Sequence, residues 1–539
     1  MDKTIGAAFA ATVEAFPERT FLTDGHQQFS FREAAEQCDR IAEALLGLGL
    51  TRHDRVALWL PNSPQWVLIA LACAKLGILI VPINTRNKAE ETRHILAQSK
   101  VAALVMVGRY WDIDYCQLLS VSLPSFDGRT SDVSGNPQLP DLRHVIVLDG
   151  EQADFGMPAA MAPSGDVSEL RRQVEADVVV ADPAVTVFTS GTTGYPKGAV
   201  HSHIILRNCM NIARAMHVEP GDVILGHMPF YHIAGLCTAL FPAAILGCTL
   251  LTVAHWQPRT VAELIAGHKV NIFGGIPTHF IDLADAIESA RLDTSCLKSA
   301  WIGGATVTPE VARRAKQVTQ LTALQSVYGM TETTSTTVLS AFEDPIEIVC
   351  ENKGKPIGDF EVAVVDPETG DRRPTGEDGE IRVRGHIVMS GYLDDPEATA
   401  NVMTADGWFK TGDIGRFDDA GYLKVTGRLK DMFIVGGTNA YPAEIERCLQ
   451  ELDGVRQVVV VGVPEPRLGE VGFAFIQRSE DCRFAEADVI AFARARLADY
   501  KVPRHVRFVE SFPLTSTNKI QRHVLAAQAE ALLRGPEKA

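Results

Sequence analysis

The sequence lacks the cysteine pairs that a zinc ribbon or a disulfide framework requires. Its ten cysteines, from Cys38 to Cys482, are scattered over 539 residues, and no two of them form a C-x-x-C pair. Both a structural zinc site and a small secreted fold held by disulfides are therefore disfavoured. Scattered cysteines suit a reducing compartment, so we expect a cytoplasmic protein.

Basic runs of the kind that bind nucleic acid or anionic lipid are also missing. The formal net charge is −16 at pH 7, which opposes long-range attraction to phosphate backbones. We therefore expect no nucleic-acid partner. A free nucleotide remains an acceptable ligand, because a local cradle of backbone N–H groups with one or two cations and Mg²⁺ outweighs a distant, screened net charge.

Signals for secretion or membrane insertion are weak. The first 16 residues carry two carboxylates and neither a basic region nor a long apolar core, which is typical of an amphipathic helix rather than a signal peptide. Residues 233–251 contain no charge and are long enough to cross a bilayer. Two glycines and Pro242 interrupt this stretch, so it predicts a buried helix, a turn and a buried strand, with no integral membrane segment.

The length and the order of apolar segments predict an α/β protein of several domains. A chain of 539 residues exceeds one ordinary hydrophobic core. Up to about residue 180, helical segments such as FREAAEQCDRIAEALLGLG alternate with short apolar strands such as RVALWL, which indicates β-α-β units and a largely parallel sheet. Residues 120–168 are richer in turn formers, and a second alternating series runs from residue 185 to about 340.

The last 200 residues predict a different organisation. Strand-like segments between turn signals, among them FEVAVVD, GEIRVRG and GYLKVTG, indicate a mostly antiparallel β unit. After residue 427 two helical and two strand-like segments predict a small α+β domain. We therefore expect a large domain over residues 1–427, a hinge over 428–431 and a small domain over 432–539.

The segment TVFTSGTTGYPKGAVHSH has the composition of a phosphate-binding loop. It begins as an apolar strand and ends in helix-compatible residues, with three glycines, four hydroxyls and Lys197 between. Glycines let the backbone approach phosphate oxygens, hydroxyls add donors and lysine supplies a cation. No Gly-Lys-Ser/Thr closes the segment, so it is not a Walker A loop. Taken alone, such a run is more often a flexible linker.

Ten of these residues, TSGTTGYPKG (Thr189 to Gly198), resemble the signature loop of the adenylate-forming enzymes, the superfamily of acyl-CoA synthetases, luciferases and peptide-synthetase adenylation domains. Further segments occur in that superfamily's order and extend the resemblance over roughly residues 31–522. These segments are GGATVTPE, SVYGMTET, WFKTGDIG, GRLKDMFIVGGTNAYPAEIE and FPLTSTNKIQR.

The resemblance implies an ATP site. By analogy, Tyr328 stacks on adenine, Thr331 meets the α-phosphate, Glu332 holds Mg²⁺, and Asp413 accepts both ribose hydroxyls with Arg428 as a second ribose contact. Without the family these would be a core tyrosine, an exposed glutamate, a turn and a solvated cation. The full set expected around ATP is Thr189, Ser190, Gly191, Thr192, Thr193, Gly194, Lys197, Gly303, Gly304, Ala305, Tyr328, Gly329, Met330, Thr331, Asp413 and Arg428.

The segment near the C-terminus implies a catalytic lysine, Lys519. A carboxylate must attack a polyanion, so charge repulsion is the main barrier and a positioned ammonium lowers it. Asn518 stands where many relatives have glycine, although some aryl-CoA ligases carry asparagine there. The resemblance also makes Lys430 a hinge about which the small domain turns between the two half-reactions.

The sequence says less about the carboxylic acid and the acyl acceptor than about the ATP site. The resemblance places His232, Ile233 and Gly329 at the acyl pocket, with a satisfied core histidine as the competing interpretation of His232. It implies coenzyme A contacts at Arg86, Gly436, Gly437, Tyr500 and Lys501, although Leu468 replaces a tryptophan common in relatives near that surface. The pair His201 and His203 has no third metal ligand in an obvious partner motif, so metal binding there is disfavoured.

The expected function is an AMP-forming ligase that joins a small carboxylic acid to coenzyme A through an acyl-adenylate. The pattern is closest to ligases for aromatic or alicyclic acids and to medium-chain fatty acyl-CoA synthetases. Two alternatives stay open: an acyl-AMP ligase that loads a carrier protein, and an inactive nucleotide-binding homologue. A homodimer is compatible with the resemblance. No G-x-S-x-G elbow or G-x-G-x-x-G after a strand supports a hydrolase or a dehydrogenase.

Overall fold

The computed structural model describes most of the chain, namely residues 3–129, 131–148, 166–189, 196–304, 307–351, 353–436, 438–479, 482, 484–514 and 520–534. The chain divides into two compact units. Unit 1 contains Met1–Glu361 and Val383–Phe409, and unit 2 contains Val362–Arg382 and Lys410–Ala539. The hinge expected over residues 428–431 stays a prediction.

The first sheet of unit 1 confirms the β-α-β units predicted from the alternating segments. Its inner strands β10, β4, β3, β5 and β9 run parallel. Helix α2 (Phe31–Gly47) leads into β3, and α3 (Pro64–Lys75), α4 (Ala89–Gln98) and α5 (Tyr115–Ser120) lie between the successive strands β3, β4, β5 and β9. A capping box starts α2, where Ser30 Oγ accepts from the Glu33 N–H. In spatial order the strands are β21 (Gly391–Tyr392), β11 (Lys197–Ser202), β10 (Pro183–Thr189), β4 (Leu79–Pro82), β3 (Arg55–Trp59), β5 (Ala103–Val107), β9 (His144–Leu148) and β8 (Ser131–Asp132).

One expectation for this sheet was wrong. The residues after the glycine-rich loop, which were expected to be helix-compatible, form the strand β11, and helix α7 (Ile205–Ala215) begins three residues later. Strand β11 pairs antiparallel with β10 on one side, where Thr189 opposes Lys197, and with β21 on the other. Because Gly198–Ser202 are all buried between these neighbours, sheet pairing overrides the weak local preference of this segment.

The second sheet of unit 1 confirms the second alternating series. Strands β1, β13, β12, β14, β15 and β16 are parallel neighbours. Their order brings the ends of β14, β15 and β16 together, and these ends carry two of the predicted motifs. The strands, in spatial order, are β2 (Gln28–Ser30), β1 (Thr20–Thr23), β13 (Thr249–Thr252), β12 (Val223–Gly226), β14 (Ile272–Gly275), β15 (Ser299–Ile302), β16 (Ala323–Tyr328), β17 (Val338–Leu339) and β18 (Lys353–Pro356).

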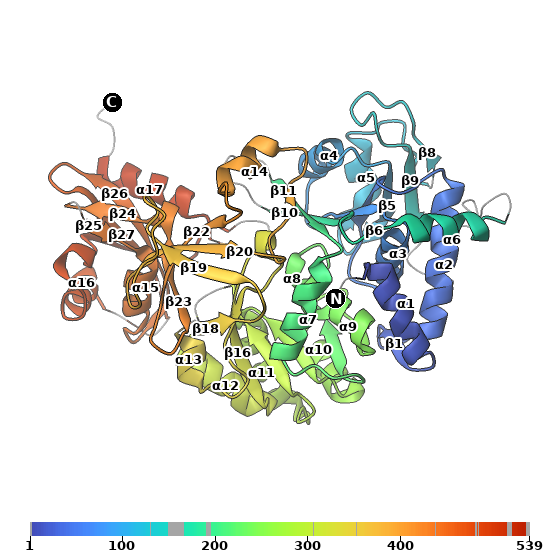
Figure 1. Cartoon of the computed structure of the whole chain (residues 1–539). Helices are drawn as coiled ribbons and strands as arrows, with labels where there is room; N and C mark the ends of the chain where they lie inside the picture. The colour runs from blue at the N-terminus through green and yellow to red at the C-terminus, as the bar shows by residue number, and fades with distance from the viewer. Residues whose placement is uncertain are drawn as a thin grey trace. The chain divides into compact units, whose positions relative to one another are not determined.

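Helices form layers on both faces of these sheets (Figure 1). One core is shared by both sheets with α1 (Ile5–Ala15), α2, α3, α7, α8 (Ile233–Gly235), the π-helix η2 (Leu236–Leu240) and α9 (Phe241–Leu246). The other face of the second sheet packs against α10 (Pro258–His268), α11 (Pro277–Ala290) and α12 (Pro309–Thr319). The other face of the first sheet packs against α4 and α5.

The uncharged stretch of residues 233–251 folds as predicted. It forms the continuous helical run α8–η2–α9, a turn at Gly247 with φ of 75°, and the start of β13. The left-handed turn favours glycine, because a side chain there is strained. Within the described residues, no helix is both long and apolar enough to cross a bilayer.

Unit 2 contains two groups of strands. Neighbouring strands β19 (Glu361–Val365), β20 (Gly379–Arg384), β22 (Phe409–Phe417) and β23 (Leu423–Arg428) form the first, with β22 and β23 antiparallel. The second follows the predicted α+β pattern, with a sheet covered by α15 (Pro442–Gln450), α16 (Glu486–Arg494) and α17 (Arg522–Arg534). Its strands are β24 (Phe433–Val435), β25 (Thr438–Ala440), β26 (Val455–Glu465), β27 (Gly469–Arg478) and β28 (His505–Phe508).

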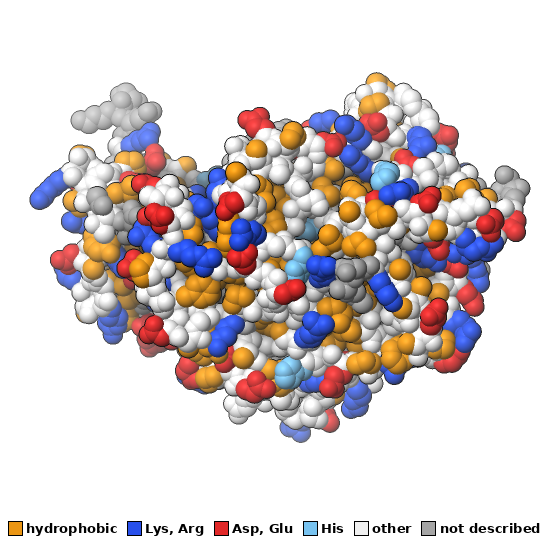
Figure 2. Space-filling view, in the orientation of Figure 1, with side chains coloured by type: hydrophobic (Ala, Val, Ile, Leu, Met, Phe, Trp, Pro, Cys, Tyr) orange, Lys and Arg blue, Asp and Glu red, His pale blue; other side chains and the backbone are white. Residues whose placement is uncertain are grey.

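Figure 2 shows acidic and basic side chains interspersed over the visible face. Mixed charges of this kind are screened beyond about 10 Å at moderate ionic strength. Binding of an anionic nucleotide therefore depends on local donors rather than on the net charge.

Candidate active site

The ends of three parallel strands in unit 1 bring two predicted ATP segments together. Parallel pairing opposes Ile302 on β15 to Ser326 on β16, so the residues that follow them lie side by side. The Gly303 N–H donates to the Gly275 carbonyl at 3.1 Å, which ties the first segment to β14. Gly304 adopts φ of +80°, a conformation that side chains rarely tolerate.

The second segment makes a tight turn that needs glycine. A Cβ atom at Gly329 would lie 2.0 Å from the Ser335 carbonyl oxygen, so no larger residue fits. The turn continues into a short 3-10 helix, η3 (Thr331–Thr333), in which Thr331 and Glu332 are only 7% and 8% exposed. The predicted phosphate and metal residues are thus held rigidly at the end of β16.

A tyrosine connects Glu332 with Lys197. The Tyr392 hydroxyl donates to Glu332 Oε1 at 3.0 Å, and Lys197 Nζ lies 5.4 Å from the centre of the Tyr392 ring. Burial and the neighbouring carboxylate raise the pKa of Tyr392 well above its ordinary value, so the hydroxyl stays a donor. The Glu332 carboxylate is an oxygen ligand of the kind that Mg²⁺ takes, and the Lys197 ammonium suits phosphate. Sequence reasoning missed Tyr392, because nothing in SGYLDD marks it.

Several predicted site residues lie outside the described residues. They are Ser190, Gly191, Thr192, Thr193, Gly194, Ala305, Gly437 and Lys519.

The two predicted ribose residues pair with each other in unit 2. Asp413 on β22 opposes Arg428 on β23, and Arg428 Nε lies 3.0 Å from Asp413 Oδ1. Asp413 is buried at 5% exposure, whereas half of the Arg428 side chain is exposed. The Asp413 segment, which without the family would be a turn, is the middle of a strand. Strand pairing therefore fixes the carboxylate in position.

The segment predicted to carry the catalytic lysine has anchored ends. A bridge between Leu514 and Ile520 joins the residues on either side of 515–519. Just beyond, Arg522 makes two hydrogen bonds to Glu446, at 2.6 and 2.8 Å, and one to the Val460 carbonyl at 2.9 Å. This fork–fork pair is a strong, geometrically specific contact.

The residues predicted for the hinge and for coenzyme A lie in different surroundings. Lys430 is exposed in the 3-10 helix η4 (Leu429–Asp431). Gly436 has φ of +57° and donates its N–H to the Leu468 carbonyl at 2.7 Å. Lys501 pairs with Glu444 at 2.7 Å and lies beside Tyr500, while Arg86 is exposed in unit 1.

His232 caps a helix at the predicted acyl pocket. Its Nδ1 accepts from the Ala234 N–H at 3.2 Å, at the start of α8. An accepting Nδ1 places the proton of the neutral ring on Nε2. The next residue, Ile233, is buried. This capping hydrogen bond gives His232 a structural role. It is therefore compatible with the interpretation of His232 as a core residue as well as with a role at the acyl pocket.

Trp301 forms part of the sheet face that looks toward α8 and η2. Gly274 on β14 opposes Trp301 on β15, and a Cβ atom at Gly274 would lie 2.0 Å from Trp301 Nε1. The indole therefore lies directly across Gly274. Trp301 belongs to the core shared with η2, whereas its neighbour Ile302 faces α10–α12. Sequence reasoning missed this residue, since an apolar strand residue carries no functional signal.

The two histidines of the H-x-H pair are buried at the end of β11. The Ile5 N–H donates to His203 Nδ1 at 3.1 Å. Burial lowers the pKa of both histidines to about 4, so both rings are neutral at physiological pH. In the described part of the chain, no three His, Cys, Asp or Glu side chains gather as a metal site.

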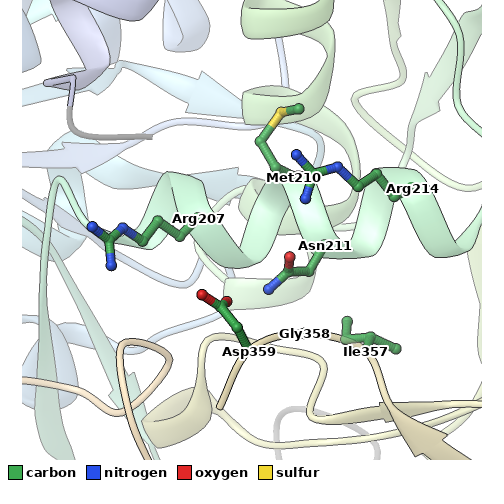
Figure 3. A pocket seen from close by; sticks show the side chains of 7 residues that line it. All are labelled: Arg207, Met210, Asn211, Arg214, Ile357, Gly358 and Asp359. Carbon is green, nitrogen blue, oxygen red and sulfur yellow. The ribbon is translucent and has the colours of Figure 1, made fainter.

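A separate cavity of about 640 Å³ opens beside α7 in unit 1 (Figure 3). Figure 3 shows Asn211 pointing toward the segment that carries Gly358, close to the carboxylate of Asp359. None of the predicted ATP, acid or coenzyme A residues lines it. Its lining residues are Arg207, Met210, Asn211, Arg214, Ile357, Gly358 and Asp359.

Comparison with known proteins shows the family to which this chain belongs. The sequence model of the AMP-binding enzyme family matches residues 9–393, and that of the AMP-binding enzyme C-terminal domain matches residues 444–519. The chain belongs to the AMP-binding enzyme family. It is an AMP-forming acyl-CoA ligase that uses ATP and coenzyme A as substrates, as the resemblance of the motifs predicted.

Two curated relatives span nearly the whole chain. One, from Rhodococcus jostii, is named 3-[(3aS,4S,7aS)-7a-methyl-1,5-dioxo-octahydro-1H-inden-4-yl]propanoyl:CoA ligase; it is 35% identical, with 97% of this chain and 98% of the relative covered. The other, the medium-chain acyl-CoA ligase ACSF2 of Rattus norvegicus, is named mitochondrial and is 32% identical, with 99% and 89% covered.

Solved structures agree on the fold. The ATP-bound MatB of Rhodopseudomonas palustris superposes with a TM-score of 0.81 at 26% identity, covering 99% of this chain and all of that one. The amide bond synthetase McbA of Marinactinospora thermotolerans superposes with a TM-score of 0.81 at 27% identity, covering 98% and 100%.

Proposed function

We propose that this acyl-CoA ligase activates a carboxylic acid with a bulky alicyclic ring system. The observation that carries the proposal is the indole of Trp301 lying across Gly274, on the sheet face that looks toward the predicted acyl residues. A flat apolar surface of this size suits a rigid ring system better than a narrow channel would. The name of the relative from Rhodococcus jostii, a bicyclic propanoyl:CoA ligase, supports the same class of acid.

The polar atom of this indole adds to the argument. Trp301 is only 6% exposed, yet its N–H makes no hydrogen bond within the described part of the chain. Unlike the Trp66 N–H, which is buried without a partner among the described residues, the Trp301 N–H is not fully enclosed. A ring carbonyl or hydroxyl of the acid would supply an acceptor. Such a contact discriminates more sharply than apolar packing, because a substrate without the acceptor leaves the donor unpaired.

The proposed first half-reaction joins the acid to AMP. A carboxylate oxygen attacks the α-phosphorus of ATP, the bond to the bridging oxygen breaks, and pyrophosphate leaves with that electron pair. Lys519 and Thr331 would stabilise the charge on the α-phosphate, while Lys197 and the glycine-rich loop would hold the departing phosphates. Mg²⁺ bound at Glu332 would neutralise phosphate charge. Asp413 and Arg428 would orient the ribose.

The proposed second half-reaction releases AMP. The small domain turns about Lys430 and withdraws Lys519. The thiol of coenzyme A releases its proton to solvent, the sulfur attacks the acyl carbonyl, and the acyl–phosphate bond breaks to give the thioester and AMP. His232 would stand between the acid and the approaching thiol, with its proton on Nε2.

A pyrophosphate-release screen with purified enzyme tests the acid. The panel contains alicyclic propanoates with and without a ring ketone, benzoates, and fatty acids of short to long chain, each with and without coenzyme A. We expect the highest kcat/KM for ring-bearing acids. The preference for the ring ketone should fall about tenfold in Trp301→Phe, which keeps an aromatic ring but removes the N–H donor.

A second candidate acid is a medium-chain fatty acid. The 32% identity to the medium-chain acyl-CoA ligase of Rattus norvegicus favours it. A screen in which fatty acids exceed every ring-bearing acid, with Trp301→Phe leaving selectivity unchanged, would decide for this candidate. The cytoplasmic location and a homodimer both stay predictions.

A further inference from the structure

Two strained residues follow the short helix that carries the predicted phosphate and metal residues. Directly after η3, Thr334 and Ser335 adopt φ of 54° and 69°, and both values lie in the left-handed region. Neither residue is glycine, and a β-branched threonine is a clear outlier there. Strain of this kind persists only where the surrounding structure imposes it. We call residues 331–336 the η3 turn, and contacts from outside must hold it.

The amide of Asn208 contacts the η3 turn from α7. Its Nδ2 donates to the Thr334 carbonyl at 2.9 Å and to the Thr336 carbonyl at 2.8 Å. Both partners are acceptors, so the amide must present its NH₂ group to them and not its oxygen. Asn208 is fully buried, so water cannot take over either hydrogen bond. One side chain thus fixes the carbonyls on both sides of the strained Ser335.

A second segment of unit 1 holds the η3 turn independently. The Thr334 hydroxyl donates to the Ile387 carbonyl at 2.6 Å, and the Met389 N–H donates to the Glu332 carbonyl at 2.8 Å. These partners follow β20, whereas Asn208 belongs to α7. Two elements that are distant from the turn in sequence therefore impose its conformation.

The oxygen of the Asn208 amide has no comparable partner. In the described part of the chain, Asn208 Oδ1 is buried and accepts no hydrogen bond. A buried acceptor without a partner costs about as much free energy as two ordinary hydrogen bonds contribute. The amide therefore adds little to the stability of the whole fold. Its effect is local, because its two N–H donors set the conformation of the η3 turn.

We propose that Asn208 is a positioning residue for adenylate formation, whose two donors hold the η3 turn so that Thr331 and Glu332 face the nucleotide. Asn208 acts through the turn and takes no part in bond making itself. The proposal rests on the roles proposed above for Thr331 and Glu332. A loosened turn displaces both groups, and a displacement of about 1 Å can slow a reaction about 100-fold.

Separate assays of the two half-reactions of Asn208→Ala test the proposal. The kcat of ATP–pyrophosphate exchange, which reports adenylate formation, should fall about 10- to 100-fold. The KM for ATP should change little, because the proposed ribose residues Asp413 and Arg428 lie on other strands. Thioester formation from supplied acyl-AMP should stay near wild type, because the charge of the departing phosphates no longer has to be offset.

Asn208→Asp separates the hydrogen bonds from packing. Aspartate has nearly the same shape as asparagine, but its carboxyl group offers at most one donor, and none when it is ionised. We expect it to lose pyrophosphate exchange as Asn208→Ala does. In both variants the Mg²⁺ concentration for half-maximal exchange should rise, because Glu332 is displaced. Should Asn208→Ala fail to fold, Asn208→Asp fills the same space and gives the same test.

Asn271→Ala is the matched control. Asn271 also bridges two backbone groups, since its Oδ1 accepts from the Val223 N–H at 2.8 Å and its Nδ2 donates to the Cys296 carbonyl at 3.2 Å. It lies directly before β14, at the edge of the sheet opposite to the candidate active site. Asn271→Ala should leave pyrophosphate exchange per mole of folded enzyme unchanged, even if its Tm falls.

The outcomes distinguish a failure of the proposed function from a failure of the positioning role. Wild-type exchange in Glu332→Gln would show that the roles proposed for the η3 turn are wrong, and the role of Asn208 with them. If Glu332→Gln is impaired but Asn208→Asp is not, the turn works without the donors of Asn208, and the proposal is overturned alone. An equal loss of both half-reactions in Asn208→Ala would show that Asn208 only supports the fold, which also overturns it.

Discussion

The residues expected around ATP and those expected to bind coenzyme A are held in opposite ways. Glu332 and Asp413 are 8% and 5% exposed, and each lies in or next to a strand with a partner to its carboxylate. Arg86 is exposed in the loop after β4. Buried charges with fixed partners are pre-organised for a transition state, whereas an exposed cation offers only binding surface.

This comparison implies that substitutions in the two regions act on different kinetic parameters. Changes in the buried group should lower the rate of adenylate formation or the affinity for ATP. Changes at Arg86 should alter only the affinity for coenzyme A. The expected effects below run from the largest to the smallest.

Lys519→Ala should give the largest effect. Removing the cation that offsets charge repulsion should lower adenylate formation by about 10²- to 10³-fold or more. Thioester formation from supplied acyl-AMP should stay near wild type, because the lysine is withdrawn in that step. Single-turnover assays of each half-reaction measure the two rates. Lys316→Ala, on α12, is the control, and an equal loss of both half-reactions would contradict the assignment.

Glu332→Gln should follow, with a decrease in kcat of about 100-fold. The amide still accepts the hydrogen bond from Tyr392 but no longer carries the charge that suits Mg²⁺. Higher Mg²⁺ should restore part of the activity. Tyr392→Phe removes only the hydrogen bond and should cost less than tenfold. If Tyr392→Phe is as damaging as Glu332→Gln, the carboxylate acts through its position rather than its charge.

Asp413→Asn should raise the KM for ATP about 10- to 100-fold, since hydrogen bonds to a charged group contribute about 1.5–3 kcal/mol. Arg428→Gln should have a smaller effect, because half of that side chain is exposed to water. Initial rates over a range of ATP concentrations measure both. An Arg428 effect larger than that of Asp413 would break the link between burial and effect size.

His203→Gln should leave turnover near wild type and change only stability. The folded-state pKa of about 4 lies below the ordinary value of 6.5, so the stabilisation is present above pH 6.5 and is lost as the pH falls toward 4. For one such histidine the free energy of unfolding should fall by about 2 kcal/mol between pH 7 and pH 5. Urea unfolding at both values measures this, with exposed His26→Gln as the control.

A pH dependence that is the same in wild type and His203→Gln would show that other groups carry it. His201 is buried as well, so a double variant with both His201→Gln and His203→Gln extends this test. In that variant the loss between pH 7 and pH 5 should be smaller still.

Much of the fold could be predicted from local patterns. Helix and strand periods along residues 31–107 and 442–508 match the elements found, because each period is written in contiguous residues. Strand β11 could not be predicted in this way. Its residues are not strong strand formers, and pairing with β10 and β21 decides their conformation.

The candidate active site also has features that local patterns predict and features that they do not. The sequence alone determined the motif order and the family, because short motifs in a set order can be identified without knowing which contacts they make. The tertiary structure decided which groups meet: Tyr392 with Glu332 across 60 positions, Trp301 over Gly274, and Asn208 with the Thr334 carbonyl across 126 positions. Those contacts depend on strand register and on packing between distant segments, which no local pattern encodes.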